Sequence, residues 1–389
     1  MMNKLLIYDV AISGHHSEYI NYLVDYIKAN GENGIKYIFV VHTDFEKHFP
    51  DIFEKGINID FLEWQPIKRE ELESIENKNS ISSSLTSMEL LGIYTNRLKI
   101  GEVIVLDFHN IKYGSLFKKV NYEITTILFL QFYRLNKNSL KEKIEYYKRY
   151  LLTKWAISNK SIKRVFVLND QTTVDFMNRE FKTDVFKVLA DPIPVLKPEP
   201  NFKIYEYYQI QPARKIFLHI GALGARKGTD EVIEAAFKLS SDHQKKVAIL
   251  LVGKAPAQDE LVYNNRIREV QEKTNVQIFW DNQFVPTPMM KSLFDQCFSV
   301  LLPYKNAEFS SGILGHAAAA KKPVIATNAG LIKELVSDYN LGLLLERPNA
   351  YFLAEKIEEL LNSNHSFEEV NSFVKEHTPK KFAETLLLG

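Results

Sequence analysis

The sequence predicts an α/β protein in which two domains of similar size each contain a parallel sheet. Short apolar runs of strand length alternate with amphipathic stretches of helix length along the whole chain, the pattern of strands joined by crossover helices. The chain has 389 residues, more than one ordinary hydrophobic core holds. Between the halves, residues 191–200 contain four prolines, which favours a stiff, extended connection.

Strands and helices are expected in regular alternation in both halves. The first half carries strands at Lys4–Val10, Lys36–Val41, Glu102–Leu106 and Arg164–Leu168, with helices at Ser17–Ala29, Ser84–Leu98, from Leu116 onward and Leu140–Ile157. The second half carries strands at Lys215–Ile220, Val247–Val252, Val276–Trp280, Ser299–Leu302 and Pro323–Ala326, with helices at Thr229–Leu239, Asp259–Lys273, Met289–Asp295, Ser311–Ala320, Leu331–Val336 and Tyr351–Leu361.

The composition is typical of a soluble globular protein, with 46% hydrophobic and 25% charged residues. A formal net charge of +1 gives no global argument for nucleic-acid binding. The only cysteine, Cys297, excludes an intrachain disulfide and a cysteine zinc cluster, so we expect a small buried side chain. No apolar run reaches the roughly 18 residues of a membrane span. The N-terminus has the pattern of a core strand rather than of a signal peptide.

The stretch from Pro303 to Gly330 carries the strongest functional signal. The apolar strand Ser299–Leu302 runs into a loop with one carboxylate, Glu308, and Ser310–Gly312 then open a helix of small residues. Serine at a helix start can cap backbone donors, and these donors, with the helix dipole, attract anions. The small residues within 312–320 let a ligand or another backbone come close. The stretch therefore predicts an acid beside a phosphate-binding helix start.

A second phosphate signal follows the strand Lys215–Ile220. The loop Gly221–Gly228 has glycines that permit a tight turn, and Arg226 and Lys227 put two cations where the strand meets the next helix. Arginine can bind two phosphate oxygens at once, and lysine supplies a compact charge. A structural turn with surface cations is the alternative for this loop alone. The sequence contains neither Gly-x-Gly-x-x-Gly nor a Gly-Lys-Ser/Thr loop, which argues against dinucleotide and ATPase sites.

Residues 134–164 are strongly basic, with ten Lys and Arg residues against two Glu, a local balance of +8. Tyrosine, leucine and tryptophan are interleaved with these cations between Tyr146 and Trp155. A basic helix with interleaved aromatic residues can lie on an anionic membrane surface. The alternative is a solvated helix whose aromatic side chains enter the core.

Together, the loop with Arg226-Lys227-Gly228, the run Glu308-x-x-Ser-Gly-Ile-Leu-Gly-His-Ala and the run Lys322-Pro-Val-Ile-Ala-Thr resemble glycosyltransferase family 4. The resemblance is specific from about Arg214 to Leu345 and architectural over the first half. It implies the GT-B fold, an α/β architecture of two doubly wound Rossmann-like domains with an interdomain cleft. It also implies a retaining, metal-independent hexosyltransferase whose donor substrate is a nucleotide-diphosphate sugar and which needs no cofactor.

The resemblance also suggests the domain limits. We expect an N-terminal, acceptor-side domain over residues 1–195, a linker over 196–212 and a nucleotide-sugar-binding domain over 213–366. Residues 367–389 are expected as a helix that packs back on the N-terminal domain.

By resemblance, the donor site belongs to the second half. Arg226 and Lys227 would clamp the diphosphate and offset the charge that develops on the leaving group, and Glu308 would hold hydroxyls of the donor sugar. The remaining donor-binding candidates are the amides at Ser311, Gly312, Ile313 and Leu314, the loop residues Gly221 and Gly253, and Phe284 and Val285 as flanks of the nucleobase. For the last two residues, core packing is the alternative.

Two positions depart from the family pattern. The second glutamate of its Glu-x7-Glu motif, which grips the ribose hydroxyls, is His316 here. Histidine can hydrogen-bond one hydroxyl but does not accept two as a carboxylate does, so nucleotide affinity and base preference stay open, and a structural His316 is the alternative. The arginine that usually follows the first loop glycine is Ala222, so one cation is missing unless Arg226 replaces it.

In the first half, Gly14, His15 and His16 follow the first strand and resemble the glycine-bearing loop of the family, which faces donor phosphate and acceptor. A histidine there could donate to phosphate or accept a proton from the acceptor, and structural capping of the loop is the alternative. His109 follows another strand at its carboxyl end, where α/β sheets bind ligands, and resembles the family histidine near the sugar O6. Asp107 could instead orient this loop.

These assignments predict sugar transfer from a UDP- or GDP-sugar to a hydroxyl group of a carbohydrate or lipid-linked acceptor, in glycan, glycolipid or polysaccharide biosynthesis. The expected catalytic residues are Glu308, His109, Lys227 and Arg226, with no metal site and no nucleic-acid partner. A nucleotide-sugar 2-epimerase and a non-catalytic nucleotide- or sugar-binding module are the alternatives. We expect cytoplasmic residence, with peripheral contact of residues 134–164 to an anionic inner membrane surface.

Overall fold

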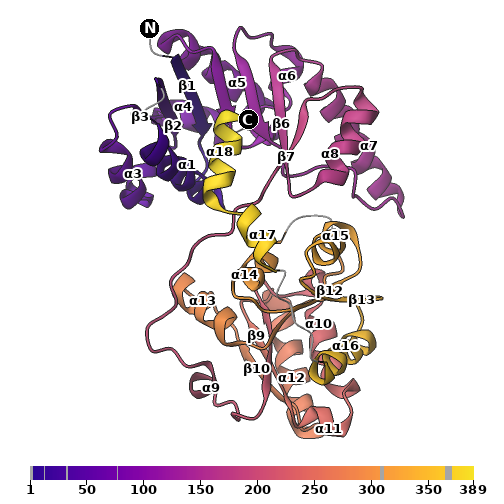
Figure 1. Ribbon diagram of the computed structural model, residues 1–389. Helices are drawn as coiled ribbons and strands as arrows, with labels where there is room; N and C mark the ends of the chain where they lie inside the picture. The colour runs from indigo at the N-terminus through magenta and orange to yellow at the C-terminus, as the bar shows by residue number, and fades with distance from the viewer. Residues whose placement is uncertain (1–2, 13, 32–33, 77, 307–310, 364–369) are drawn as a thin grey trace. The chain divides into compact units, whose positions relative to one another are not determined.

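The computed structural model describes residues 3–12, 14–31, 34–76, 78–306, 311–363 and 370–389, and it consists of two compact units (Figure 1). Unit 1 comprises Met1–Ala190 together with Pro379–Gly389, and unit 2 comprises Asp191–Thr378. The division therefore falls before the proline-rich stretch, whereas the sequence suggested a separate linker over 196–212.

Unit 1 is built on a seven-stranded sheet in the order β3-β2-β1-β4-β5-β6-β7, whose strand pairs are all parallel. Its strands are β1 (Asn3–Asp9), β2 (Ile35–Val41), β3 (Leu62–Pro66), β4 (Glu102–Val105), β5 (Glu123–Ile127), β6 (Ile162–Leu168) and β7 (Phe186–Leu189). Its helices are α1 (His16–Asn30), α2 (Phe45–His48), α3 (Pro50–Ile57), α4 (Arg69–Glu76), α5 (Ser80–Leu98), the 3-10 turn η1 (Phe108–Asn110), α6 (Gly114–Phe117), α7 (Leu140–Ile157), α8 (Gln171–Phe181) and α18 (Pro379–Leu388).

Unit 2 is built on a six-stranded sheet in the order β10-β9-β8-β11-β12-β13, again with parallel pairs. Its strands are β8 (Lys215–Ile220), β9 (Val247–Val252), β10 (Gln277–Asp281), β11 (Ser299–Leu302), β12 (Val324–Thr327) and β13 (Gly342–Leu345). Its helices are α9 (Ile204–Tyr207), the 3-10 turn η2 (Ala225–Lys227), α10 (Thr229–Lys238), α11 (Ser241–Gln244), α12 (Ala257–Lys273), α13 (Thr287–Gln296), α14 (Gly312–Ala319), α15 (Gly330–Asp338), α16 (Ala350–Asn362) and α17 (Val370–Glu376).

Each sheet reverses its strand order at one point. In unit 1 the chain runs from β1 out to β3 and then from β4 out to β7, and in unit 2 from β8 out to β10 and then from β11 out to β13. The expected α/β, doubly wound class is therefore confirmed for both units. Such sheets bind ligands at the carboxyl ends of the strands beside the reversal, so the topology favours the loops after β1, β4, β8 and β11.

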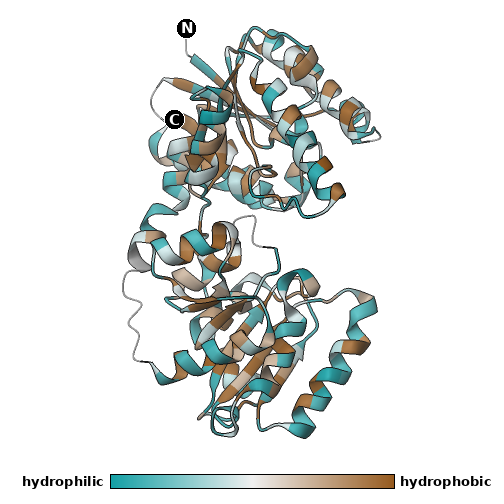
Figure 2. Cartoon of the chain, turned by 90° about the vertical axis from the view of Figure 1, so that its right-hand side faces the viewer, coloured by the Kyte–Doolittle hydropathy of each residue, from teal (hydrophilic) through white to brown (hydrophobic). Residues whose placement is uncertain are grey.

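The central strands are buried on both faces, which explains their continuous apolar runs. Along β1, Leu6 and Tyr8 belong to one hydrophobic cluster, and Leu5 and Ile7 belong to the cluster on the other face. Strand β8 alternates in the same way between two clusters of unit 2. Apolar colour is accordingly concentrated in the sheets and polar colour on the outer faces of the helices (Figure 2).

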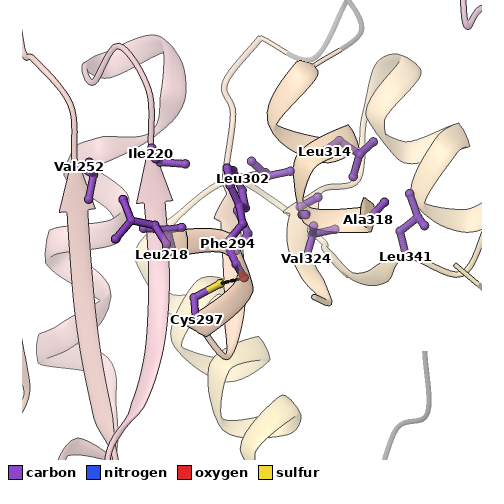
Figure 3. Close-up of a cluster of buried hydrophobic side chains, with 14 of the residues drawn as sticks. Leu218, Ile220, Val252, Phe294, Cys297, Leu302, Leu314, Ala318, Val324 and Leu341 are labelled. Carbon is purple, nitrogen blue, oxygen red and sulfur yellow. Dashed lines mark hydrogen bonds between the residues drawn. The ribbon is translucent and has the colours of Figure 1, made fainter. Parts of the chain in front are cut away.

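In unit 2 the core reaches the small-residue helix α14. Leu314 and Ala318 of this helix lie in the cluster that also holds Leu302 of β11 (Figure 3). Gly315 also packs closely, because a Cβ there would lie 3.0 Å from Ile193 Cγ1. Cys297 is buried as expected, and burial raises the pKa of its thiol to about 12. The small side chains of α14 therefore serve core packing as well as its exposed start.

The proline-rich stretch is attached to unit 2. Glu199 N donates to Pro288 O at 3.0 Å, and Ile193 N donates to His377 O at 2.7 Å. Further along, Ile204 is fully buried in the core of the unit. Backbone hydrogen bonds and buried isoleucines thus make this stretch part of the domain, although prolines exclude regular secondary structure from it.

The C-terminal segment is divided between the two units. Helix α17 contacts α14 and buries Phe373 in unit 2, whereas α18 contacts α1 and buries Phe382 and Leu386 in unit 1. The return to the first domain, which the sequence suggested for 367–389, is therefore made by 379–389, because the apolar face of α18 completes the unit 1 core. Residues 367–369 lie outside the described residues.

Candidate functional site

The glycine loop between β8 and α10 is shaped by three residues with left-handed backbone. Gly221, Gly224 and Gly228 have φ values of 115°, 142° and 75°, which L side chains rarely adopt. Close contacts add to this requirement, because a Cβ on Gly228 would collide with Pro303 O and one on Gly221 with Lys227 Nζ. The loop therefore brings the end of β8 and the start of α10 against the end of β11.

Lys227 is a buried cation at the centre of this loop. The residue is 8% exposed, its Nζ donates to Ile220 O at 3.2 Å, and Nζ lies 5.4 Å from the ring centroid of Tyr304. Burial, with a smaller effect of Arg226, lowers the pKa of Lys227 to about 8. Within the described ranges no carboxylate pairs with its ammonium group. A buried cation without a counter-ion favours binding of an anion.

A buried polar chain holds the glycine loop in place. Gly224 N donates to Thr229 Oγ1 at 2.9 Å, Thr229 Oγ1 lies 3.1 Å from His219 Nε2, and His219 Nδ1 lies 3.0 Å from Leu301 O. Burial lowers the pKa of His219 to about 4, so its ring is neutral at physiological pH. The consistent pattern is an Nδ1–H that donates to Leu301 and an Nε2 that accepts from Thr229. Loop, β8 and β11 are thereby joined.

The two phosphate signals of the sequence come together in unit 2. Tyr304 OH lies 3.4 Å from Ser311 Oγ, and Ile313 Cδ1 lies 3.9 Å from the position of a Cβ on Gly221. Tyr304, beside Lys227, therefore links the glycine loop to the start of α14. The cap expected from Ser311 is wrong, because its side chain makes no capping hydrogen bond and contacts Tyr304 instead. Ser311 therefore leaves the first-turn N–H groups of α14 uncapped by its own side chain.

Glu308 and Ser310 lie outside the described residues. Gly312 is exposed, with open space where a Cβ would be, and Leu314 is buried in the core, so only its backbone N–H remains relevant to a ligand. That N–H already donates to Ser311 O at 2.9 Å. The donor groups at this helix start are therefore those before Leu314.

The residues proposed to flank a nucleobase differ sharply in exposure. Phe284 is 86% exposed, whereas Val285 is 7% exposed and belongs to the hydrophobic core. Val285 is thus a core residue, the alternative that the sequence left open, and it lies directly before Pro286, the N-cap residue of α13. His316 is half-buried, and its ring stacks on that of Phe294 at a centroid distance of 5.4 Å.

Arg226 belongs to the glycine loop, and Gly253, which follows β9, lies against the start of this loop at Gly221. Arg226 is exposed, and its carbonyl accepts from Lys305 N at 3.0 Å. Gly253, with φ of 131°, lies so close to the chain that a Cβ would collide with Gly221 O. Gly253 therefore permits the close approach of two strand ends, and Arg226 presents its side chain to solvent beside Lys227.

In unit 1, the loop after β1 carries a histidine that is fixed by a buried acid. His16 Nδ1 lies 2.8 Å from Asp9 Oδ2, and Asp9 is 1% exposed. Burial lowers the pKa of His16, but the hydrogen bond and charge of Asp9 outweigh it, so the pKa lies above its ordinary value. His15 is exposed, with Nδ1 3.5 Å from Glu18 Oε2, and Gly14 has a φ of 70°. His16 is therefore the positioned histidine of this loop.

His109 lies in η1, directly after β4, as expected from its position at a strand end. Asp107 Oδ1 accepts from His109 N at 2.8 Å, so Asp107 does orient the loop. Lys112 Nζ lies 2.8 Å from His109 Nδ1. Burial and the neighbouring Lys112 lower the pKa of His109. Since an ammonium group can only donate, His109 accepts at Nδ1 and carries its proton on Nε2.

A cavity of about 560 Å³ opens among these side chains at the carboxyl end of the unit 1 sheet. The loops after β1, β4 and β5 and one side of α7 enclose it. Its lining includes the three predicted residues Gly14, His15 and His16 together with Asp107 and His109, and also Tyr19, Lys112, Phe129, Glu145, Lys148 and Arg149. The first-half candidates therefore share one cavity.

Several residues of these sites escaped sequence reasoning. Asp9 is the last residue of β1, and Tyr304 follows β11. Lys112 follows η1, and Thr229 begins α10. The usable signal was a polar residue within a few positions of a strand's carboxyl end. The order of the strands in the sheet decides which of these residues come together in space, and this order cannot be predicted from a local sequence pattern.

The side chains of the basic stretch, residues 134–164, lie in different environments, and some of them are buried. Arg134 forms a buried pair with Asp170, with Nε 2.6 Å from Oδ2, and Tyr146 enters the core. Among the described residues, no helix combines the length and apolarity needed to cross a membrane. In the same ranges no group of three His, Cys, Asp or Glu side chains is arranged to hold a metal ion.

Comparisons with known proteins find similar sequences among glycosyltransferases. Residues 203–378 match the family described as glycosyl transferases group 1. An alpha-D-kanosaminyltransferase of Streptomyces kanamyceticus is 26% identical over 149 residues, covering 38% of this chain and 37% of that protein. An uncharacterized glycosyltransferase of Methanocaldococcus jannaschii is 28% identical over 180 residues, covering 44% and 45%. The chain thus spans less than half the length of these curated relatives.

Solved structures match over almost the whole chain. HepE of Anabaena, in complex with UDP and glucose, has a TM-score of 0.59 at 15% identity, covering 98% of this chain and 95% of that one. Sucrose-phosphate synthase of Thermosynechococcus elongatus has a TM-score of 0.66 at 14% identity, covering 99% and 97%. Residues 203–378 therefore match a glycosyl transferases group 1 domain, and the chain has the fold of the GT-B glycosyltransferases.

Proposed function

We propose that the protein is a retaining glycosyltransferase that moves a sugar from a UDP- or GDP-sugar to a hydroxyl acceptor. The observation that supports this most directly is Lys227, a buried ammonium group without a carboxylate partner among the described residues. It lies near the start of α14, whose N-cap residue Ser311 makes no capping hydrogen bond with its side chain. A buried cation without a counter-ion binds diphosphate strongly, because the diphosphate supplies the missing negative charge and its oxygens accept charge-assisted hydrogen bonds.

In this proposal, unit 2 binds the donor through its diphosphate. Lys227 donates to a diphosphate oxygen, the exposed Arg226 adds a second cation, and the N–H groups at Gly312 and Ile313 contribute at the helix start. Both cations stabilise the charge that grows on the diphosphate as its bond to the sugar breaks. Glu308 holds donor-sugar hydroxyls, and His316 meets the ribose in place of a carboxylate.

The chemical step follows a front-face course. The bond from the anomeric carbon to the diphosphate oxygen breaks, and the acceptor oxygen bonds to that carbon on the same face. The acceptor proton passes to a diphosphate oxygen, so the products are the retained glycoside and the nucleoside diphosphate. In unit 1, His109 offers the Nε2–H donor to a sugar hydroxyl, and His16, whose pKa Asp9 raises, offers a ring N–H donor to phosphate.

We further propose that transfer requires no metal ion, because the cations of unit 2 carry the leaving-group charge. Turnover in the presence of EDTA should equal that in its absence. Loss of turnover that added Mg²⁺ or Mn²⁺ restores would contradict this part of the proposal.

The test of the function is incubation of the purified chain with UDP-, GDP- and ADP-sugars, with and without carbohydrate acceptors. Product mass and the anomeric NMR signal report transfer and retention. Lys227→Met and Glu308→Gln should each lower turnover by at least about a hundredfold while the circular dichroism spectrum stays unchanged. Full turnover in either variant would contradict its assigned role.

The same assay separates the other functions. Conversion of the donor into an isomer without acceptor would identify a 2-epimerase. Binding of a nucleotide sugar, seen as a thermal shift, without transfer, isomerisation or hydrolysis would identify a binding module.

We also propose peripheral contact of unit 1 with an anionic membrane through α7. Five large apolar side chains of this helix are exposed: Leu140, Ile144, Tyr147, Leu151 and Trp155. At 3.6 residues per turn they fall within an arc of about 80°. Four exposed lysines flank that arc, Lys143 and Lys154 on one side and Lys141 and Lys148 on the other. An apolar stripe bordered by lysines suits a helix that lies in the interface of an anionic bilayer.

A further inference from the structure

The cavity of unit 1 has an excess of cationic side chains. Lys112, Lys148 and Arg149 line it, against the two acids Asp107 and Glu145. Glu145 serves two of the cations at once, with Oε1 2.7 Å from Arg149 Nε and Oε2 3.8 Å from Lys148 Nζ. One carboxylate cannot neutralise both, so positive charge remains on this wall.

Lys112 adds a cation that has no acid of its own. It is half-buried, its Nζ bonds to the imidazole of His109, and within the described residues no carboxylate lies at ion-pair distance from it. Burial lowers its pKa, the charge of Asp107 partly offsets this, and the charges of Lys148 and Arg149 lower the pKa further. Such a group is stabilised by an incoming anion, because the anion replaces the missing counter-ion.

Arg149 is held so that part of its guanidinium group faces no protein acceptor. Its Nε donates to Glu145 Oε1, and its Nη1 lies 3.4 Å from Gln131 O. Nη2 has no partner among the described residues. Guanidinium groups fixed in this way suit phosphate oxygens, since the donors are directed before the ligand arrives.

Other residues of the lining are apolar. Phe129, which is half-buried, lines the cavity with Leu128 and Leu130, and its ring is nearly parallel to that of the buried Tyr19, with centroids 6.2 Å apart. Tyr113, also half-buried, lies beside the cations, with its ring centroid 5.0 Å from Lys112 Nζ. Aromatic faces pack well against the apolar face of a sugar ring. The cavity thus combines a carbohydrate-compatible wall with a cationic wall.

We propose that this cavity binds a phosphorylated saccharide acceptor, with its phosphate held by Lys112 and Arg149 and its sugar on the aromatic wall. Lys148 supports the phosphate from the rim. The inference rests on the proposed transferase function, because it defines the substrate class of the same reaction. A soluble sugar phosphate and a lipid-linked sugar diphosphate share this chemistry, and the test distinguishes them.

The experiment measures binding to the full chain at constant ionic strength by titration calorimetry. The probes are glucose 6-phosphate, glucose, and a polyprenyl diphosphate-linked sugar in detergent micelles, against wild type, Lys112→Gln, Arg149→Gln and the matched surface control Lys187→Gln. We expect one phosphorylated probe to bind wild type more tightly than glucose does. That probe should bind the two cavity variants about tenfold to a hundredfold more weakly, with Lys187→Gln unchanged.

The phosphorylated probe whose binding the cavity variants weaken shows whether the acceptor is a soluble sugar phosphate or a lipid-linked sugar diphosphate. Equal affinity of wild type and both cavity variants for the phosphorylated probes overturns the inference, as does binding of neither probe. UDP and GDP binding are measured on the same samples. Because the nucleotide is assigned to unit 2, retained binding of either nucleotide with no phosphate effect removes the inference alone, whereas absent binding of both counts against the proposed function itself.

Discussion

At the scale of single residues, burial of the Lys227 ammonium group lowers the stability of the fold, a cost that its proposed role in diphosphate binding would explain. Its pKa of about 8, against an ordinary value of 10.5, means that the folded chain binds this proton less well than the unfolded chain. Between these two values the unfolded state holds more protons, so stability rises with pH across that window. Below pH 8 the buried charge destabilises the fold.

Lys227→Met should therefore stabilise the protein at pH 7, by up to about 3 kcal/mol, and the gain should shrink as the pH approaches 10. Urea denaturation across this range checks both statements. The same variant should bind UDP at least tenfold more weakly. Lys238→Met, an exposed lysine on α10, is the matched control and should change neither property.

Wild-type affinity for UDP should also depend on pH through Lys227. It should be constant below the pKa of about 8 and fall above it, because the neutral amine no longer attracts the diphosphate. In Lys227→Met this fall should be absent. Calorimetric titrations from pH 7 to pH 9.5 measure the difference, and an unaltered pH profile in the variant would remove Lys227 from the diphosphate site.

His16 provides a residue-scale prediction in unit 1. Because Asp9 raises its pKa, the Asp9→Asn variant should titrate His16 at a lower pH than wild type does, since burial remains while the hydrogen bond and charge of the carboxylate are lost. NMR titration of the histidine ring signals reports the value. His15, which is exposed, serves as the internal control. An unchanged His16 titration would mean that the Asp9 pair does not set its charge.

At the scale of elements, the glycine loop depends on Thr229. Thr229→Val should leave Gly224 N–H and His219 Nε2 without their buried partner, which costs about 1–3 kcal/mol for an unsatisfied group. Thr229→Ser keeps the hydroxyl and should retain most of the stability. Chemical denaturation compares the two variants. If Val and Ser behave alike, the hydroxyl does not hold the loop.

The apolar stripe of α7 supports a second element-scale prediction. Wild type should co-sediment with vesicles that contain anionic lipid, less so at high salt and not with zwitterionic vesicles. Replacing Leu151 and Trp155 by Gln should weaken binding at least tenfold, because both apolar insertions are lost. The matched control replaces Leu261 and Val262, exposed apolar residues of α12. Equal loss in the control would remove the specific role of α7.

Strands β3, β5, β7 and β13 show where element prediction failed. Strand β5 reads Glu-Ile-Thr-Thr-Ile and contains two polar threonines that are nonetheless buried, so its hydropathy resembles that of a loop. Pairing with β4 and β6 makes it a strand. The central strands, with continuous apolar runs, were predicted because burial on both faces leaves a local signature.

At the scale of the whole molecule, two phenylalanines nine positions apart belong to different units. Phe373 of α17 is buried in unit 2, and Phe382 of α18 is buried in unit 1, 4.6 Å from the ring of Tyr19. Each Phe→Ala replacement should cost about 3–5 kcal/mol. We expect Phe382→Ala to destabilise unit 1 and Phe373→Ala to destabilise unit 2.

Hydrogen exchange with mass spectrometry distinguishes these outcomes, because it reports protection separately for peptides of β1 and β8. Faster exchange in the same unit for both variants would contradict the division of the C-terminal segment.

The doubly wound arrangement was suggested by the resemblance to a family. The sequence by itself determined the α/β class, the end of a strand at Gly221, the place of His109 after a strand, and Lys227 as a loop cation. These features are local, since hydropathy period, glycine and charge are properties of neighbouring residues. Tertiary structure alone decided that Lys227 is buried beside Tyr304, that Asp9 fixes His16, and that Arg134 is internal while Trp155 is exposed. Such facts depend on strand order and helix packing, which bring together residues far apart in the chain. Burial then removes water from the charged groups and so changes their pKa values and their need for a partner.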